Sequence, residues 1–243
     1  MQVAPKPRAC YRQEAWSVLG GQEATVLIKK ERDAMPASKG KSVSALKPET
    51  DKEGLDRLIF FSDAVFAIAI TLLILDIRLP AGSELLDDTG LFRRLLSIWP
   101  QYMAYVISFV VIGLFWTGHH RKFRLIQRYD NRLLLLNLFV LMLVAFIPFP
   151  TSVLSESGSR TATIFYALTI IMAGLVMMAL WFYASINYRL IDPAILKSQL
   201  RREIFGPVSV IGVFVLSIGL AFFDVNLARL SWLLVAIAQR FYQ

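Results

Sequence analysis

The side chains most able to do chemistry inside the apolar part of this chain gather in two short segments. The first begins at Arg57 and runs through Phe61 and Ser62 to Asp63, where a carboxylate enters a long apolar run. An unpartnered carboxylate is costly in apolar surroundings, although the amino-terminal turn of a helix favours a negative charge. Arg57 and Asp63 fall on different faces of a helix, so each is predicted to bond to a neighbouring helix rather than to the other.

The second segment holds Trp116, His119 and His120, whose rings can all donate hydrogen bonds. Adjacent histidines point roughly 100° apart on a helix, whereas helical metal ligands favour positions i and i+4. The segment therefore predicts no metal site. It favours a set of hydrogen bonds that join this part of the chain to Ser62 and Asp63.

Enzymatic chemistry has little support in the sequence. No Gly-x-Ser-x-Gly, His-Glu-x-x-His or phosphate-binding glycine loop occurs, and the single cysteine, Cys10, excludes an intrachain disulfide. Ionisable residues are also scarce near the centres of the apolar runs, where a proton-coupled pump usually places them. From this pattern we expect neither enzymatic activity nor a cofactor.

Long apolar runs are the elements that must position these residues. Hydrophobic residues make up 56% of the 243-residue chain, and runs of about 18 or more with few charges predict membrane spans. The expected fold class is all-α, a polytopic membrane protein with six transmembrane helices. The last two spans are the shortest, so a re-entrant pair is the alternative there. The predicted ranges are 56–79, 99–119, 133–151, 161–188, 206–223 and 226–241.

The chain is predicted to have two parts: a basic, mostly disordered cytoplasmic tail over residues 1–54 and a membrane domain over 55–243. The tail mixes charged and small residues with little periodicity. It adds nothing recognisable before Met35, so Met35 is a candidate for the true start. The Lys and Arg content of the tail would suit anionic lipid, although a topology signal alone explains the same charge.

The basic residues predict that both termini are cytoplasmic. With the amino terminus inside, only a minority of the 26 basic residues lie outside. This bias explains the net charge of +8 as a topology signal, so nucleic-acid binding is not expected. The outside basic residues are Arg78, Arg93, Arg94, Arg160 and Arg229.

One stripe of the first span has two interpretations. Ile68, Thr71, Leu72 and Leu75 recur at helical spacing, as ordinary helix packing requires. The same stripe would also suit a pore wall, in which large apolar side chains form a constriction that closes by expelling water. The Thr71 hydroxyl could then offer an oxygen to a dehydrating cation.

The sequence around these residues resembles the transmembrane protein 175 family of potassium channels. The run from Arg57 through Phe61, Ser62 and Asp63 into Ala-Val-Phe-Ala-Ile-Ala-Ile-Thr-Leu-Leu looks like its first-helix motif. Trp116 with His119 and His120 is similar to its second helix, and Asn137 with the Pro148-Phe149 turn to its third. The likeness is motif-specific over about residues 55–150 and excludes the tail.

The resemblance implies a bacterial member with one six-helix repeat, assembled as a homotetramer in the inner membrane. Helix 1 would line a pore that passes K⁺, with a gate at Ile68, Leu72 and Leu75 and the pore threonine at Thr71. A structural network would hold that helix. Its implied members are Arg57, Phe61, Ser62, Asp63, Trp116 and His119.

Two other classes stay open. A proton-coupled secondary transporter would show inverted repeats and broken helices at mid-membrane, and neither is clear in this sequence. A non-conducting membrane scaffold would use the apolar stripe only to associate with other copies.

Overall fold

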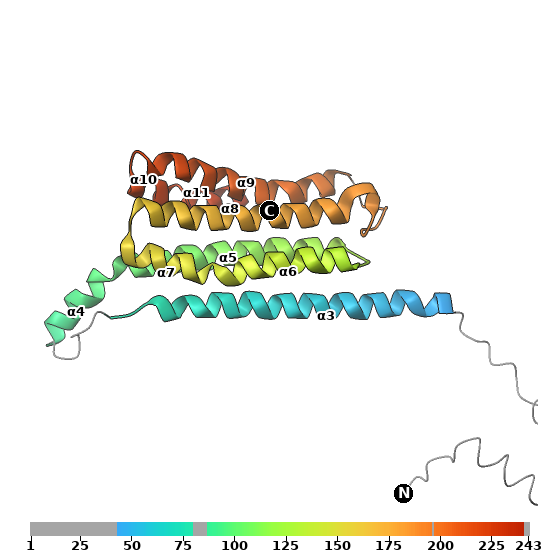
Figure 1. Ribbon diagram of the computed structural model, residues 1–243, viewed down its shortest axis with the longest axis horizontal. Helices are drawn as coiled ribbons and strands as arrows, with labels where there is room; N and C mark the ends of the chain where they lie inside the picture. The colour runs from blue at the N-terminus through green and yellow to red at the C-terminus, as the bar shows by residue number, and fades with distance from the viewer. Residues whose placement is uncertain (1–42, 80–86, 196, 241–243) are drawn as a thin grey trace, which may run out of the picture. The chain divides into compact units, whose positions relative to one another are not determined.

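The computed structural model describes residues 43–79, 87–195 and 197–240, and these are almost entirely helical (Figure 1). Within them, β-structure is limited to an isolated bridge between Ile126 and Ile191. The chain divides into two compact units, Met1–Lys47 and Pro48–Gln243, and the arrangement below is that of the second. The candidate start at Met35 lies outside the described residues. The predicted all-α fold is confirmed.

The first helix, α3, spans Val43–Leu72 and continues into a 3-10 turn, η1, over Leu73–Asp76. It begins well before the predicted residue 56, so residues 43–54, which the sequence assigned to the tail, are helical. Residues Lys52–Asp76 are the part long and apolar enough to cross a membrane. At a 1.5 Å rise per residue, these 25 residues reach roughly 38 Å, more than a hydrocarbon core of about 30 Å.

A short helix that the sequence did not predict, α4 (Asp88–Ser97), precedes the second span. The second span itself is α5 (Trp99–Leu125), which begins at the predicted residue but continues past residue 119. Arg121 and Lys122, expected in a loop, therefore belong to a helix. This difference matters because the extra turns place both cations against a later helix.

The third span is built from α6 (Asn131–Phe146) and α7 (Pro148–Ser157), and the fourth from α8 (Arg160–Ser185). The carboxylate of Asp130 caps α6 by accepting from the Leu133 backbone N–H. Gly158 follows α7 in the left-handed conformation, at φ 57°, which glycine adopts without steric cost. A 3-10 turn, η3 (Ile186–Tyr188), closes the fourth span.

The last part of the chain holds α9 (Lys197–Ala221), α10 (Val225–Leu230) and α11 (Leu233–Arg240). Helix α9 starts before the predicted residue 206 and is long enough to cross a membrane. The predicted sixth helix, 226–241, is instead two short helices, and the turn between them contains Trp232, whose indole donates to Ser217 at 2.7 Å. Among the described residues, five helices qualify as spans, and Val225–Val235 is a shorter apolar stretch.

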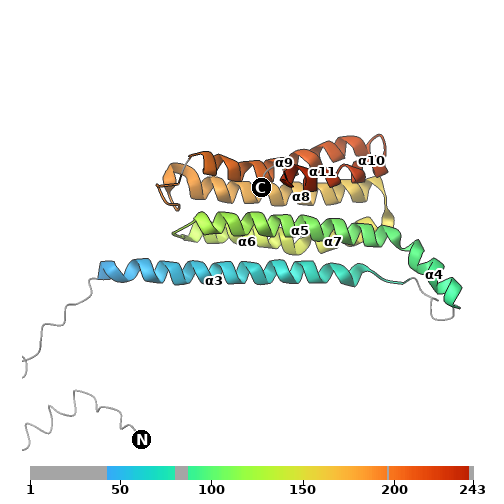
Figure 2. The ribbon, with the colours of Figure 1, turned by 180° about the vertical axis from the view of Figure 1, so that it is seen from behind.

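Helix α8 is the centre of the packing. Its Ala173, Met177 and Trp181 are buried, and α6, α7 and α9 all pack against it. The two views agree that α3 runs along the side of α5 and α6 opposite to α8 and α9 (Figure 2). Helix α3 is thus the outermost of the long helices, and among the described residues only one of its faces is covered by the rest of the bundle.

Candidate pore helix and its anchoring network

The two faces of α3 have opposite environments. One face is buried against the bundle at Ser62, Phe66, Ala69 and Leu73, at spacings of three and four residues. The predicted pore residues lie on the other face. Exposed fractions reach 58% at Ile68 and 59% at Leu75, and Thr71 and Leu72 are also exposed.

Asp63 meets α5 directly. The indole Nε1 of Trp116 donates to Asp63 Oδ1 at 2.8 Å. The Trp116 ring also lies 5.8 Å from the ring of His120. A hydrogen bond to an ionised acceptor is stronger than a neutral one, so this contact offsets part of the cost of placing the carboxylate inside a membrane span.

A buried relay joins Ser62 to His119 through a residue on a third helix. The side-chain amide of Asn137 on α6 donates to Ser62 Oγ at 2.9 Å, and Ser62 Oγ donates to the Leu58 carbonyl at 2.8 Å. The other side of the amide, Oδ1, lies 2.7 Å from His119 Nε2. Because an amide oxygen only accepts, His119 must carry its hydrogen on Nε2.

His119 is fixed further by aromatic neighbours. Its ring stacks on Phe123 at 4.2 Å and lies 5.4 Å from the ring of Phe66 on α3. Three helices thus meet at one buried polar cluster, made of Ser62, His119 and Asn137. Such contacts between polar side chains are a usual means of joining helices in a membrane.

The structure brings together only some of the residues assigned to the network. Ser62, Asp63, Trp116 and His119 lie at the junction of α3 with α5 and α6, whereas Arg57 and Phe61 lie on the exposed side of α3. Asn137, which completes the relay, was not among the predicted network residues. A polar side chain inside the apolar run of 133–150 is the signal that could have identified it.

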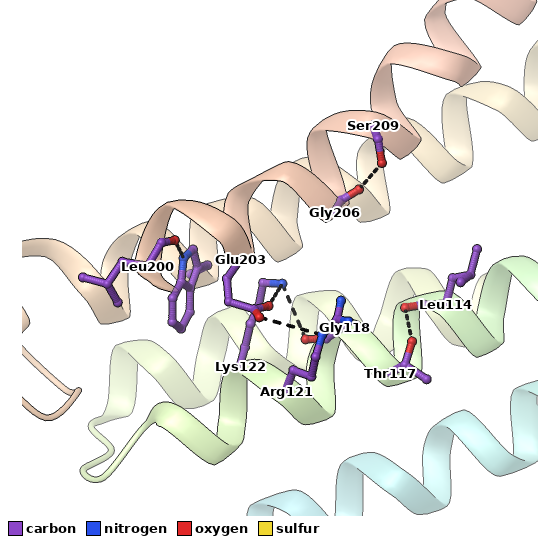
Figure 3. Close-up of polar contacts among 10 residues, drawn as sticks. Leu114, Thr117, Gly118, Arg121, Lys122, Leu200, Glu203, Gly206 and Ser209 are labelled. Atoms are coloured by element: carbon purple, nitrogen blue, oxygen red, sulfur yellow. Dashed lines mark hydrogen bonds and ion pairs between the residues drawn. The ribbon is translucent and has the colours of Figure 1, made fainter. Parts of the chain in front are cut away.

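A second polar junction, absent from the sequence-based prediction, joins α5 to α9. Lys122 is 1% exposed and its Nζ lies 3.4 Å from Glu203 Oε2, while Arg121 Nε lies 3.8 Å from Oε1 of the same carboxylate (Figure 3). Lys122 also donates to the Gly118 carbonyl at 3.5 Å. Its ammonium lies 5.9 Å from the ring centre of Trp181 on α8. Burial of this cation is tolerated because a carboxylate, a carbonyl and a ring surround it.

A proline inside α9 lies close to this ion pair. Pro207 lies inside the helix, so residue 207 has no N–H to donate to the carbonyl of Glu203. Ser209 donates to the Gly206 carbonyl at 2.8 Å beside this break (Figure 3). A small pocket of about 30 Å³ is lined by Gly118, Lys122 and Pro207 among others.

Comparison with known proteins agrees with this architecture. Residues 57–148 match the family described as endosomal/lysosomal potassium channel TMEM175. A potassium channel of Streptomyces collinus is 39% identical over 193 residues, which cover 77% of this chain and 92% of that protein. An endosomal/lysosomal proton channel, TMEM175 of Danio rerio, is 36% identical over 144 residues, covering 55% of this chain and 28% of that protein.

A solved structure extends the similarity to the fold. The crystal structure of a lysosomal potassium-selective channel TMEM175 homologue from Chamaesiphon minutus is 34% identical to this chain. It superposes with a TM-score of 0.66 over 79% of this chain and 99% of that one. Fold and similarity together define a multi-pass, all-helical membrane protein of a channel class. The chain belongs to the TMEM175 family of channels.

Proposed function

We propose that this chain forms a potassium-permeable channel whose conducting path is lined by α3. The supporting observation is the division of that helix into two faces. One face is anchored by Ser62, Phe66 and Asp63, and the other leaves Ile68, Leu72 and Leu75 uncovered. Copies of the chain that met along this second face, four in a homotetramer, would enclose a narrow apolar path.

The chemistry of the exposed face suits gating by loss of water. A ring of Ile68, Leu72 and Leu75 side chains would offer no hydrogen bonds, so a small narrowing would empty it. Thr71 provides the polar exception. Its hydroxyl donates to its own helix, to the Ile68 carbonyl at 2.9 Å, which leaves oxygen lone pairs for a passing cation.

The proposed location is the bacterial inner membrane, with both termini cytoplasmic. The excess of Lys and Arg in the segments assigned to the inside supports this orientation. The similarity to the potassium channel of Streptomyces collinus supports a bacterial setting and K⁺ as the permeant ion.

The first test is the reversal potential of the purified protein in a planar bilayer, with K⁺ on one side and Na⁺ on the other. A selective pore gives current that reverses toward the potassium equilibrium potential. Ile68→Asn, which places an amide in the constriction, should increase the open current severalfold. Leu138→Asn is the matched control, because Leu138 is an exposed apolar residue on α6 and does not belong to the α3 stripe.

Other outcomes separate the competing classes. Flux that requires a proton gradient would make the chain a proton-coupled transporter. Absence of ohmic current from folded, associated protein would make it a scaffold. Because relatives such as that of Danio rerio are named proton channels, the same bilayer should also be measured under a pH gradient with equal K⁺. A reversal potential that followed the proton gradient alone would reject K⁺ as the main permeant ion.

A further inference from the structure

Helix α4 has an apolar face that the described part of the chain leaves open. The helix has 10 residues, none of them buried. At 100° per residue, its four large apolar side chains form one arc of roughly 140°, which also contains Asp88 of the first turn, whereas Ser97 lies on the opposite side. The apolar residues of this arc are Leu91, Phe92, Leu95 and Leu96, and all four are exposed.

A helix of this length needs support for that face. Isolated helices shorter than about 12 residues are marginal in water. Both ends of α4 are stabilised. The Asp87 carboxylate caps the first turn by accepting from the Gly90 N–H at 2.9 Å, and Ile98 is buried just after the last turn. Capping alone contributes about 1 kcal/mol, so contact along the apolar arc must supply the remainder.

The position of α4 indicates what covers the arc. It ends at Ser97, and the membrane-spanning α5 begins at Trp99. Trp99, with Tyr102 one turn later, is the type of residue that gathers at the boundary between lipid and water. Figure 1 shows α4 joined to the start of α5 and inclined to its axis. A helix attached in this way to the end of a membrane span would lie at the level of the lipid headgroups.

We propose that α4 is an interfacial helix that binds phospholipid. Its apolar arc enters the boundary between headgroups and acyl chains, and Phe92 and Leu95 point deepest. Arg93 and Arg94 fall on the two flanks of the arc, where long basic side chains reach phosphate groups while their methylene stems stay in the apolar layer. The membrane surface, rather than a protein, is therefore the partner of this face.

The test measures the depth of single labels on the full-length protein. In a Cys10→Ser background, Phe92→Cys and Leu95→Cys carry an environment-sensitive fluorophore on the apolar arc, and Ser97→Cys carries it on the opposite side. The proteins are reconstituted in phosphatidylcholine vesicles with a fraction of phosphatidylglycerol. Quenching is compared between a nitroxide on the acyl chain near the headgroup and aqueous iodide.

Labels at residues 92 and 95 should be quenched severalfold more by the lipid nitroxide than the label at residue 97, and severalfold less by iodide. Two positions on the arc are used so that one variant that fails to fold does not end the test. Equal quenching of all three labels by iodide would place α4 in water and overturn the proposal. Protection of residues 92 and 95 from both quenchers, with disulfides between copies, would assign the face to a neighbouring subunit and overturn it equally.

Discussion

The indole of Trp116 donates a 2.8 Å hydrogen bond to the carboxylate of Asp63, and this contact ties α5 to the outermost long helix of the chain. Its neighbour in sequence, Ser62, is tied to α6 by Asn137. Two consecutive residues of α3 thus bond to two different helices. The rotation of α3 about its own axis is thereby fixed, which determines the residues it presents on its free face.

Trp116→Phe should destabilise the protein by about 1–3 kcal/mol, because it removes the donor and leaves the Asp63 carboxylate without it. Thermal unfolding in detergent measures the loss. Trp99→Phe is the matched control, since Trp99 is also exposed but its indole has no hydrogen-bond partner among the described residues. If the two substitutions lowered the unfolding temperature equally, the Trp116 bond would have no special role.

Asn137→Ala should cost about 2–4 kcal/mol, since it leaves both Ser62 and His119 without their shared partner in a buried site. Leu138→Ala, at the next and exposed position, should change the unfolding temperature far less. A small effect of Asn137→Ala would show that water replaces the amide and that the relay does not determine how α3 is seated.

Lys122 and Glu203 should show strong coupling. Lys122→Met alone leaves a carboxylate with only the more distant Arg121, and Glu203→Leu alone leaves a buried ammonium, so each should cost about 3–5 kcal/mol. The double variant should recover much of that loss, because it buries neither charge. Unfolding of all four proteins completes the cycle. Additive losses would contradict a direct interaction between the two side chains.

The stability of the fold should depend on pH through Asp130, and the direction of that dependence follows from the shift of its pKa. Burial opposes its ionisation, but hydrogen bonds from Tyr183 and from the Leu133 N–H, with the charge of Arg189, hold the pKa of Asp130 below its usual value. The carboxylate therefore stabilises the fold fully above its ordinary pKa of about 3.9, and this stabilisation is lost as the pH falls through the lower folded pKa.

The corresponding experiment compares the wild type with Asp130→Asn. The variant should unfold at a lower temperature at neutral pH, by an amount equal to about 1 kcal/mol for a weakened cap, and the difference should shrink in acid. Asp88→Asn, at an exposed position, serves as the control. A difference that stayed constant down to strongly acidic pH would show that the charge of Asp130 is not responsible.

The sequence predicted the membrane helices because a bilayer leaves backbone groups no partners except those within a helix. Length and hydropathy were therefore enough to identify the spans from α3 to α9. The ends of the helices were harder to predict. Helices α5 and α9 extend into polar sequence, where Arg121, Lys122 and Lys197 look like loop residues until their helical continuation is seen. The last predicted helix is interrupted at the turn that contains Trp232, whose indole donates to Ser217 on α9, a contact that helical periodicity does not reveal.

The candidate site was predictable where it depends on local spacing and not where it depends on distant partners. The stripe from Ile68 to Leu75 follows from the helical repeat alone. The pairing of Ser62 with Asn137, 75 positions apart, and of Lys122 with Glu203, 81 positions apart, depends on which helices are neighbours. No periodicity encodes that information. Helix α4 was missed because its apolar residues are too few for a membrane span and its two arginines suggest a loop.

The Lys122–Glu203 ion pair lies where the backbone hydrogen bonding of α9 is interrupted by a proline. Because Pro207 has no N–H, the carbonyl of Glu203 lacks its usual helical donor, and α9 has one hydrogen bond fewer at that residue. The side chain of the same residue is clamped to α5. We therefore expect the ion pair to hold α9 against α5 at the residue where the helix's own hydrogen bonding is weakest, so that weakening the pair would loosen this part of α9.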